Sequence, residues 1–152
     1  PSSPHPSGRR AKEAVEQARA QVASLIGAYP AEIVFTSGAT ESNNLAILGV
    51  ARALKDRTPR RRLVTTRLEH KAVLEPVEQL ASGDFSVHYL PVQPTGRVVL
   101  EAAADLITDG TLLVSVQAAN NEIGTLQPVA ELAALAREHG ALFHCDAAQA
   151  VG

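Results

Sequence analysis

The sequence contains no methionine, no tryptophan and only one cysteine, Cys145. A single cysteine excludes an intramolecular disulfide framework and fits a reducing compartment, so we expect a cytoplasmic protein. Aromatic residues make up 3% of the chain, and any core must therefore rest on alanine, valine, leucine and isoleucine. Because translation begins with methionine and this chain begins with Pro1, we expect an excised or processed piece of a longer protein.

Long apolar runs and an excess of charge are also missing. No apolar run reaches the roughly 18 residues that a membrane span requires, and no secretory signal is visible. A formal net charge of −2 argues against a nucleic-acid binder, since phosphate contacts need many cations on one face. The one dense basic cluster, residues 57–62, is interpreted as a solvated loop. With 152 residues, of which 45% are apolar, the chain is predicted to form one domain.

Hydrophobic periodicity predicts helices and strands that alternate along the chain. The predicted strands are 32–36, 62–66, 86–91, 111–117 and 141–145, and the predicted helices are 9–28, 39–54, 76–81, 100–107 and 128–139. Residues 1–8 are expected to be an irregular lead-in. Residues 70–74 are expected to form one turn, with a new helix starting at Pro76, because an interior proline removes a helical hydrogen bond. The alternation predicts an α/β fold with five parallel or mixed strands in a mostly parallel sheet, and helices on both faces.

A strand that turns on glycine into a helix is predicted at residues 36–44, Thr-Ser-Gly-Ala-Thr-Glu-Ser-Asn-Asn. The first turn of such a helix offers free backbone N–H groups and the positive end of the helix dipole. Gly38 lets the backbone come close to a ligand, and Thr40 adds a hydroxyl. This combination indicates an anion site suited to a phosphate. An ordinary glycine turn with serine and threonine capping is the alternative.

Three further polar groups follow predicted strands. His70 could stack on a flat ring and move protons near neutral pH, or it could be a surface residue that caps a helix. Asn120 and Asn121 could orient a polar ligand or simply form a turn. Asp146 could hold a pyridine nitrogen and Gln149 a phenolic oxygen, or the aspartate could merely end a strand.

All four signals should lie at the carboxyl edge of one sheet, where open α/β folds bind ligands. A phosphate clamp, a stacking imidazole, an amide and a ring-nitrogen partner together indicate pyridoxal phosphate. A metal site at His139, His144, Cys145 and Asp146 is rejected. His144 and Cys145 are adjacent on a predicted strand and point to opposite faces, and no second Cys/His pair lies at ligand spacing.

Four segments resemble the cysteine desulfurases, pyridoxal-phosphate enzymes of the class V aminotransferase group. They are residues 35–45 (Phe-Thr-Ser-Gly-Ala-Thr-Glu-Ser-Asn-Asn-Leu), 69–74 (Glu-His-Lys-Ala-Val-Leu), 120–124 (Asn-Asn-Glu-Ile-Gly) and 146–152 (Asp-Ala-Ala-Gln-Ala-Val-Gly). The opening residues 1–5 look like the family's opening without its first residue. The resemblance covers essentially the whole chain and implies part of the large, cofactor-binding domain of a fold-type-I enzyme. The small C-terminal domain and the lysine-bearing segment are expected to be absent.

The resemblance also implies a role for each matching residue. The backbone of Ala39 and Thr40 and the Thr40 hydroxyl would hold the cofactor phosphate. His70, the expected catalytic residue, would stack on the pyridine ring and shuttle protons. Asp146 would pair with the ring nitrogen, and Gln149 would bond the phenolic oxygen.

Asn121 would steer the substrate carboxylate or the phenolic oxygen. Members of the family take sulfur from L-cysteine, leave L-alanine, and pass a persulfide to a sulfur-acceptor protein in iron–sulfur cluster or thio-cofactor assembly. The resemblance further implies a homodimer, with no nucleic-acid partner and no membrane.

Two groups that the family's chemistry requires have no match here. None of the three lysines, Lys12, Lys55 and Lys71, stands where the family has its Schiff-base lysine, and Cys145 is expected to be a buried mid-strand residue rather than the persulfide carrier. The family's substrate-binding arginine is missing as well. The chain by itself is therefore expected to be inactive. Two alternatives stay open: a truncated, non-catalytic homologue that serves as a binding or dimerisation module, and another class V enzyme such as a selenocysteine lyase.

Overall fold

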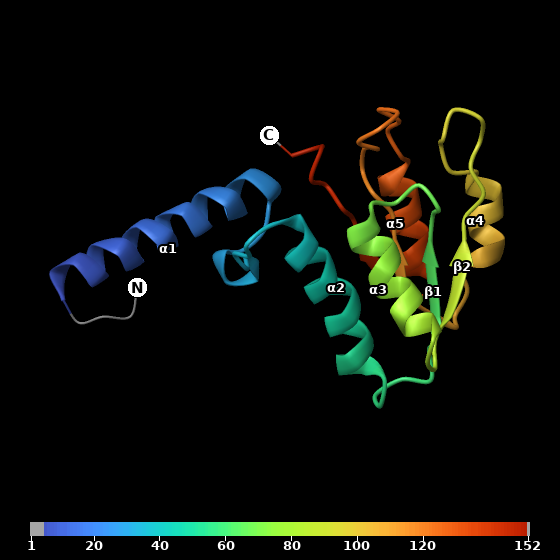
Figure 1. Cartoon of the computed structure of the whole chain (residues 1–152), viewed down its shortest axis with the longest axis horizontal. Helices are drawn as coiled ribbons and strands as arrows, with labels where there is room; N and C mark the ends of the chain where they lie inside the picture. Colours follow the sequence, from blue (N-terminus) through green and yellow to red (C-terminus); the bar gives the residue numbers. More distant parts are fainter. Residues whose placement is uncertain (1–4, 152) are drawn as a thin grey trace. The chain divides into compact units, whose positions relative to one another are not determined.

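The computed structural model describes residues 5–151 and divides into two compact units, one up to Thr36 and one from Ser37 onward. The family-like opening at residues 1–4 lies outside the described residues. The first unit contains the helix α1 (Pro6–Ile26) and a short 3-10 helix, η1 (Pro30–Glu32) (Figure 1). Residues 6–8, expected to be irregular, therefore belong to α1, with a proline at the position where its missing N–H costs nothing.

The end of α1 and the segment after it differ in how well the sequence predicted them. Gly27 ends α1 in the left-handed conformation, with φ 69°, as its position in the pattern suggested. The predicted strand 32–36 is wrong, because no strand of the described chain pairs with it. Instead, the Arg19 guanidinium donates a hydrogen bond to the carbonyl of Ile33 and lies over the Phe35 ring, 5.0 Å from its centroid. Helix-to-loop contacts thus take the place of a ladder of strand hydrogen bonds.

The second unit is built on a four-stranded sheet in the order β2-β1-β3-β4, in which every pair of neighbours is parallel. The strands are β1 (Arg62–Thr65), β2 (Ser86–Tyr89), β3 (Thr111–Ser115) and β4 (Leu142–His144). The predicted α/β class and parallel sheet are confirmed. Residues 5–151 contain four strands rather than the predicted five, because residues 32–36 do not join the sheet.

Four helices cover the two faces of this sheet (Figure 1). They are α2 (Ala39–Leu54) and α3 (Lys71–Ala81) on one face, and α4 (Leu100–Leu106) and α5 (Val129–Glu138) on the other. Adjacent residues of β1 pack into the two apolar cores, one on each face of the sheet. Leu63 packs with Ile47 of α2, whereas Val64 packs with Leu132 of α5. All residues of β3 are buried, as its continuous apolar sequence predicted.

Helix α3 runs through Pro76 without a break, so the expected restart at this proline is wrong. The proline deprives the Ala72 carbonyl of its helical donor, a cost of about 3 kcal/mol in an isolated helix. Val73, Pro76 and Val77 nevertheless form a buried face. The burial of that face against the rest of the core outweighs the missing hydrogen bond and keeps the helix continuous.

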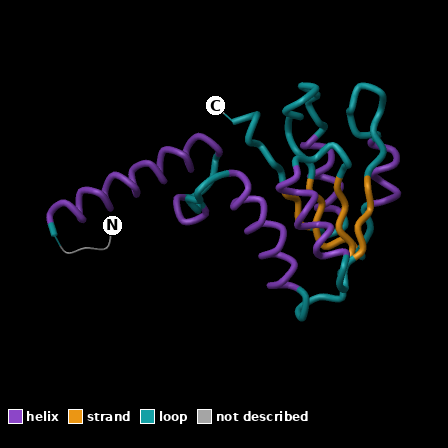
Figure 2. Tube along the Cα trace, viewed as in Figure 1, coloured by secondary structure: helices purple, strands orange, loops and turns teal. Residues whose placement is uncertain are grey.

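The remaining differences lie at the ends of elements. All four strands are shorter than predicted, so the last predicted strand residue, Cys145, falls one position beyond β4. Figure 2 shows the loops that follow the strands gathered at one edge of the sheet. No helix within residues 5–151 is long and apolar enough to cross a membrane.

Candidate small-molecule site at the carboxyl edge of the sheet

A hollow of about 220 Å³ opens where the loops after β1, β3 and β4 meet the first turn of α2. Its lining residues come from these four segments, and they are Ala39, His70, Gln117, Ala119, Asn121, Asp146, Ala148 and Gln149. Parallel strands bring their carboxyl ends to one edge, which is why segments up to about a hundred residues apart converge here. The hollow is called the edge pocket below.

Five of the six residues predicted for a cofactor site line the edge pocket. They are Ala39, His70, Asn121, Asp146 and Gln149. The sixth, Thr40, is exposed in the first turn of α2 but is not among the lining residues. The structure therefore brings the predicted groups together, with the Thr40 hydroxyl outside the hollow.

The start of α2 has the form of an anion site. Gly38 precedes the helix in an extended conformation and provides no side-chain cap, so the N–H groups of the first turn are not used by a capping residue. The carboxylate of Glu41 turns back to accept hydrogen bonds from the Ser37 N–H and hydroxyl, both at 2.6 Å. These bonds lower the pKa of Glu41. The Glu41 carboxylate is thereby bound to Ser37, one residue before Gly38.

Asp146 follows β4, and three hydrogen bonds fix it. Its Oδ2 accepts from the Asn43 side chain at 2.8 Å, and its Oδ1 accepts from the Ala148 N–H at 3.1 Å. Its backbone carbonyl accepts from the Ala118 N–H at 2.9 Å. The carboxylate is consequently oriented before any ligand arrives, which is what a ring-nitrogen partner requires.

Asn43 belongs to the motif at residues 36–44, but the motif predicted no role for it. Asn43 is only 4% exposed and belongs to the buried face of α2. It lies four residues after Ala39, so the two share one side of the helix. That spacing was a usable signal, but the partner of Asn43 lies 103 residues away and could not be read from it.

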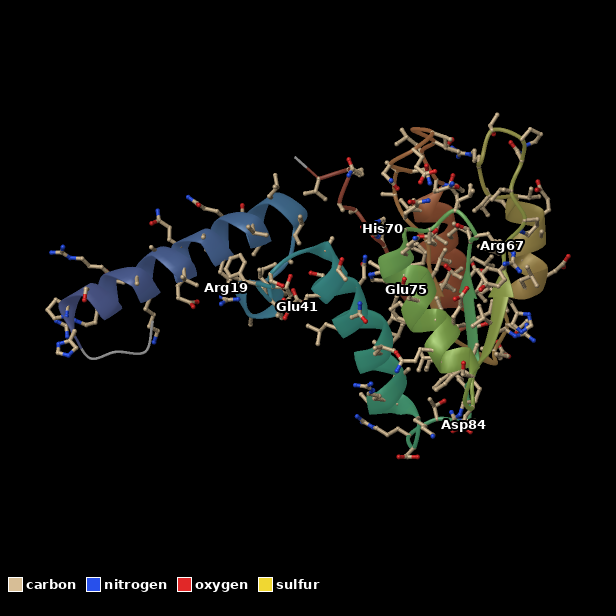
Figure 3. All side chains as sticks on the ribbon, viewed as in Figure 1. Arg19, Glu41, Arg67, His70, Glu75 and Asp84 are labelled. Atoms are coloured by element: carbon tan, nitrogen blue, oxygen red, sulfur yellow. The ribbon has the colours of Figure 1, made fainter. Side chains whose placement is uncertain are left out.

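His70 caps a helix, as one of its two readings had it, and it also lines the edge pocket, where its stacking role stays a prediction. Its Nδ1 accepts a hydrogen bond from the Ala72 N–H at 3.1 Å and thereby caps α3. In a neutral ring the proton is then on Nε2, which can donate a hydrogen bond to a ligand. Figure 3 shows His70 at the first turn of α3, with Glu75 further along the same helix.

Glu69 is the second residue of this region whose role its sequence motif did not predict. The side chain is 6% exposed, and burial is the main cause that raises its pKa from 4.5 to about 7. Hydrogen bonds from Thr66 and Gln117 act in the opposite direction, while the charge of Asp146 adds to the rise. A buried acid with a perturbed pKa at a ligand edge is the kind of group that functional sites contain.

His144 and Cys145 directly precede Asp146, and neither lines the edge pocket. His144 Nδ1 is 2.8 Å from Ser115 Oγ, and burial lowers the pKa of the imidazole. Cys145 is half-buried rather than fully buried, and burial, with the charges of Glu69 and Asp146, raises the pKa of its thiol. A protonated thiol is a poor nucleophile. Among residues 5–151, no group of three or more histidine, cysteine, aspartate or glutamate side chains could hold a metal ion.

None of the three lysines lines the edge pocket. Lys12 lies in α1, and Lys55 follows α2 and forms an ion pair with Asp84. Lys71 borders a second hollow of about 390 Å³, which His70 and Asn121 also line. This neighbouring hollow also includes Arg67, whose guanidinium lies 4.0 Å from the Tyr89 ring centroid.

A parallel sheet whose carboxyl edge surrounds a small polar hollow beside a helix N-terminus defines a small-molecule-binding α/β domain. Comparison with known proteins narrows this class. The model of the family described as "Aminotransferase class-V" matches residues 1–152, and the chain belongs to that family.

Individual relatives and a solved structure agree with this assignment. The chain is 51% identical over 148 residues to the cysteine desulfurase of Homo sapiens, covering 97% of this chain and 32% of the human protein. The chain is also 51% identical over 148 residues to the cysteine desulfurase IscS of Ehrlichia chaffeensis, and the alignment covers 97% of this chain and 36% of that protein. A solved structure of SspA in complex with cysteine superimposes with a TM-score of 0.91 at 40% identity, over 98% of this chain and 42% of that one. The chain thus spans about a third of the curated relatives it matches.

Proposed function

We propose that this chain forms part of a pyridoxal-phosphate-dependent cysteine desulfurase and carries most of its cofactor pocket. The observation that carries the proposal is the shared pocket: an oriented carboxylate, an imidazole and a helix N-terminus line one hollow of about 220 Å³. Such a set of groups fits a flat ring with a basic nitrogen and a phosphate. The similarity to proteins named cysteine desulfurase supports the reaction, and the cysteine complex of SspA supports the substrate.

Each residue of the pocket has a role in this proposal. The N–H groups of Ala39 and Thr40 bind the phosphate, and the Asp146 carboxylate binds the protonated ring nitrogen. Gln149 donates to the phenolic oxygen. His70 stacks on the ring and its Nε2–H donates to the ligand, and it shuttles protons when Nδ1 leaves the Ala72 N–H. When bound, the cofactor supplies an electron sink for the carbon next to the substrate amine.

The remaining parts of the proposal concern Asn121 and groups from outside the edge pocket. Asn121 steers the carboxylate of L-cysteine or the phenolic oxygen. The lysine that holds the cofactor and the thiolate that receives sulfur come from sequence outside these 152 residues, because no lysine lines the pocket and the pKa of Cys145 is raised. The products are L-alanine and a persulfide, which passes to an acceptor protein in iron–sulfur cluster or thio-cofactor assembly. We further propose a homodimer in the cytoplasm.

The test separates binding from chemistry. Deoxypyridoxine phosphate, which lacks the aldehyde that reacts with lysine, is titrated into the protein by calorimetry. Asp146→Asn should weaken its binding by about tenfold or more, since a charge-assisted hydrogen bond to the ring nitrogen is lost. Asp105→Asn, which changes an exposed acid of α4, is the matched control and should bind like the wild type. Equal affinities for the Asp146→Asn variant and the wild type would refute the proposal.

A further inference from the structure

The loop that carries His70 is fastened to the chain beyond β3 by a compact set of hydrogen bonds. Glu69 Oε1 accepts from the Thr66 hydroxyl at 2.8 Å, and Oε2 accepts from the Gln117 N–H at 2.9 Å. The carbonyl of Leu68 accepts from the Gln117 and Asn120 side chains, at 2.7 and 2.9 Å. Glu69 therefore joins its own loop to the chain after β3 through Oε2, while its Oε1 is held within the loop by Thr66.

His70 has little else to fix its position. The residue is exposed, and it borders both the edge pocket and the neighbouring hollow, so it has open space on two sides. Within residues 5–151, the side-chain hydrogen bond that Nδ1 accepts from Ala72 sets the ring relative to α3 but not relative to the sheet edge. The position of the imidazole over the pocket therefore depends on the loop residues that precede it.

A buried carboxyl group at this place is costly. Glu69 forms no ion pair with any cation of the described residues, and the nearby charge of Asp146 has the same sign. A neutral amide could join the same two partners without the cost of burying a charge. The cost of burying Glu69 is explained if its two oxygens, each bonded to a donor, hold the neighbouring site in place.

We infer that Glu69 is a positioning residue that latches the His70 loop to the end of β3 and thereby holds the imidazole over the edge pocket. The inference rests on the proposed function, in which that pocket binds a phosphorylated pyridine. Glu69 itself does not line the pocket, so it acts on the ligand through His70.

Two substitutions of Glu69 test whether the latch depends on the hydrogen bonds of this side chain. In Glu69→Gln, the amide oxygen can still accept from the Gln117 N–H and the amide nitrogen can donate to the Thr66 hydroxyl. In Glu69→Ala, both partners lose their acceptor, and the buried Gln117 N–H is left unpaired. Glu75→Gln, which changes an exposed acid of α3, is the matched control.

The affinity for deoxypyridoxine phosphate is the first readout. We expect Glu69→Gln to bind within about threefold of the wild type, and Glu69→Ala to bind about tenfold more weakly, as follows from leaving a buried donor unsatisfied. Thr66→Val, which removes one of the two latch bonds, should fall between them and guards against a Glu69→Ala protein that fails to fold. Wild-type affinity in Glu69→Ala or Thr66→Val, or equal losses in Glu69→Gln and Glu69→Ala, would overturn the inference.

A double-mutant cycle with His70→Ala supplies the readout that a purely structural role would leave unchanged. If Glu69 acts through His70, Glu69→Ala should cost less than about twofold in affinity once the imidazole is gone. Additive losses would overturn the inference. The His70 ring signals in NMR spectra should also shift in ligand-free Glu69→Ala but not in Glu75→Gln. This spectrum needs no ligand, so a wild type that fails to bind the probe refutes the proposed function alone, and unshifted ring signals refute the latch alone.

Discussion

The two units of the chain contrast in how much of their stability can come from packing. Among residues 5–36, only Ala23 is buried, and Leu25, Ile26 and Tyr29 are all more than half exposed. The sheet unit contains two buried apolar clusters, one on each face of its strands. A helix without a buried face is only marginally stable in water, however favourable its sequence. Local signals were therefore enough to predict α1, while the stability of the sheet unit depends on contacts between distant segments.

The largest test of this contrast compares two leucines. Leu132 in α5 is fully buried, whereas Leu25 in α1 is 67% exposed. Leu132→Ala should lower the free energy of unfolding by about 2–5 kcal/mol, through lost burial and the cavity that remains. Leu25→Ala should change it by about 0.5 kcal/mol or less. Urea unfolding followed by circular dichroism measures both, and similar losses of unfolding free energy would contradict the difference in packing between the units.

The second test compares two glutamates at different pH values. Glu69 is buried and its pKa is raised to about 7, while Glu16 in α1 is exposed and pairs with Arg19. Because the unfolded chain ionises Glu69 near its ordinary pKa, the folded state binds more protons between pH 4.5 and about 7, and stability falls as pH rises through that window. The wild type should therefore lose on the order of 2–3 kcal/mol that Glu69→Gln does not lose.

Thermal unfolding measured at several pH values between 5 and 8 checks this expectation. Glu16→Gln serves as the control and should keep the wild-type pH dependence. If the curves of wild type and Glu69→Gln run parallel over this range, the buried acid does not titrate as described.

A smaller effect is expected at the edge pocket, where two neighbouring asparagines differ in their partners. Asn43 is buried and donates to Asp146, while Asn44 donates to the Thr40 carbonyl within its own helix. Asn43→Ala should cost about 1–3 kcal/mol in unfolding free energy, because it removes the donor to Oδ2 of the partly buried Asp146 carboxylate. Asn44→Ala should cost about 0.5 kcal/mol. Chemical denaturation of both variants is the measurement, and a ratio near one would mean that the Asp146 contact contributes nothing.

The smallest effects are expected at two glycines, where substitution by alanine should change stability in opposite directions. Gly27 ends α1 with a φ of 69°, and a Cβ there would meet nothing within 4 Å, so backbone strain is the whole effect. Gly27→Ala should destabilise the end of α1 by about 1 kcal/mol. Gly49, inside α2, has room for a methyl group, and Gly49→Ala should stabilise that helix by about 0.5–1 kcal/mol. Amide hydrogen exchange resolves the two helices separately, and a change of the same sign in both would contradict the expectation.

The sequence alone predicted the class of fold and most of the edge pocket. The alternation of elements indicated a parallel sheet, and polar residues directly after its strands had to meet at one edge. That rule needs no knowledge of individual contacts, so it correctly grouped Ala39, His70, Asn121, Asp146 and Gln149. What these residues bind stays a prediction until a ligand is measured.

The errors and omissions share a different physical origin. Residues 32–36 have the composition of a strand, but a strand also requires a neighbour, and Arg19 supplies other contacts instead. Pro76 has the sequence signature of a break, but the burial of its helix face overrides it. The roles of Asn43 and Glu69 depend on partners 103 and 48 residues away. Periodicity and local propensity determine which segments form and which ends carry polar groups, because they act over a few residues. Only the tertiary structure decides which buried donor meets which acceptor, since that pairing is set by packing across the sheet.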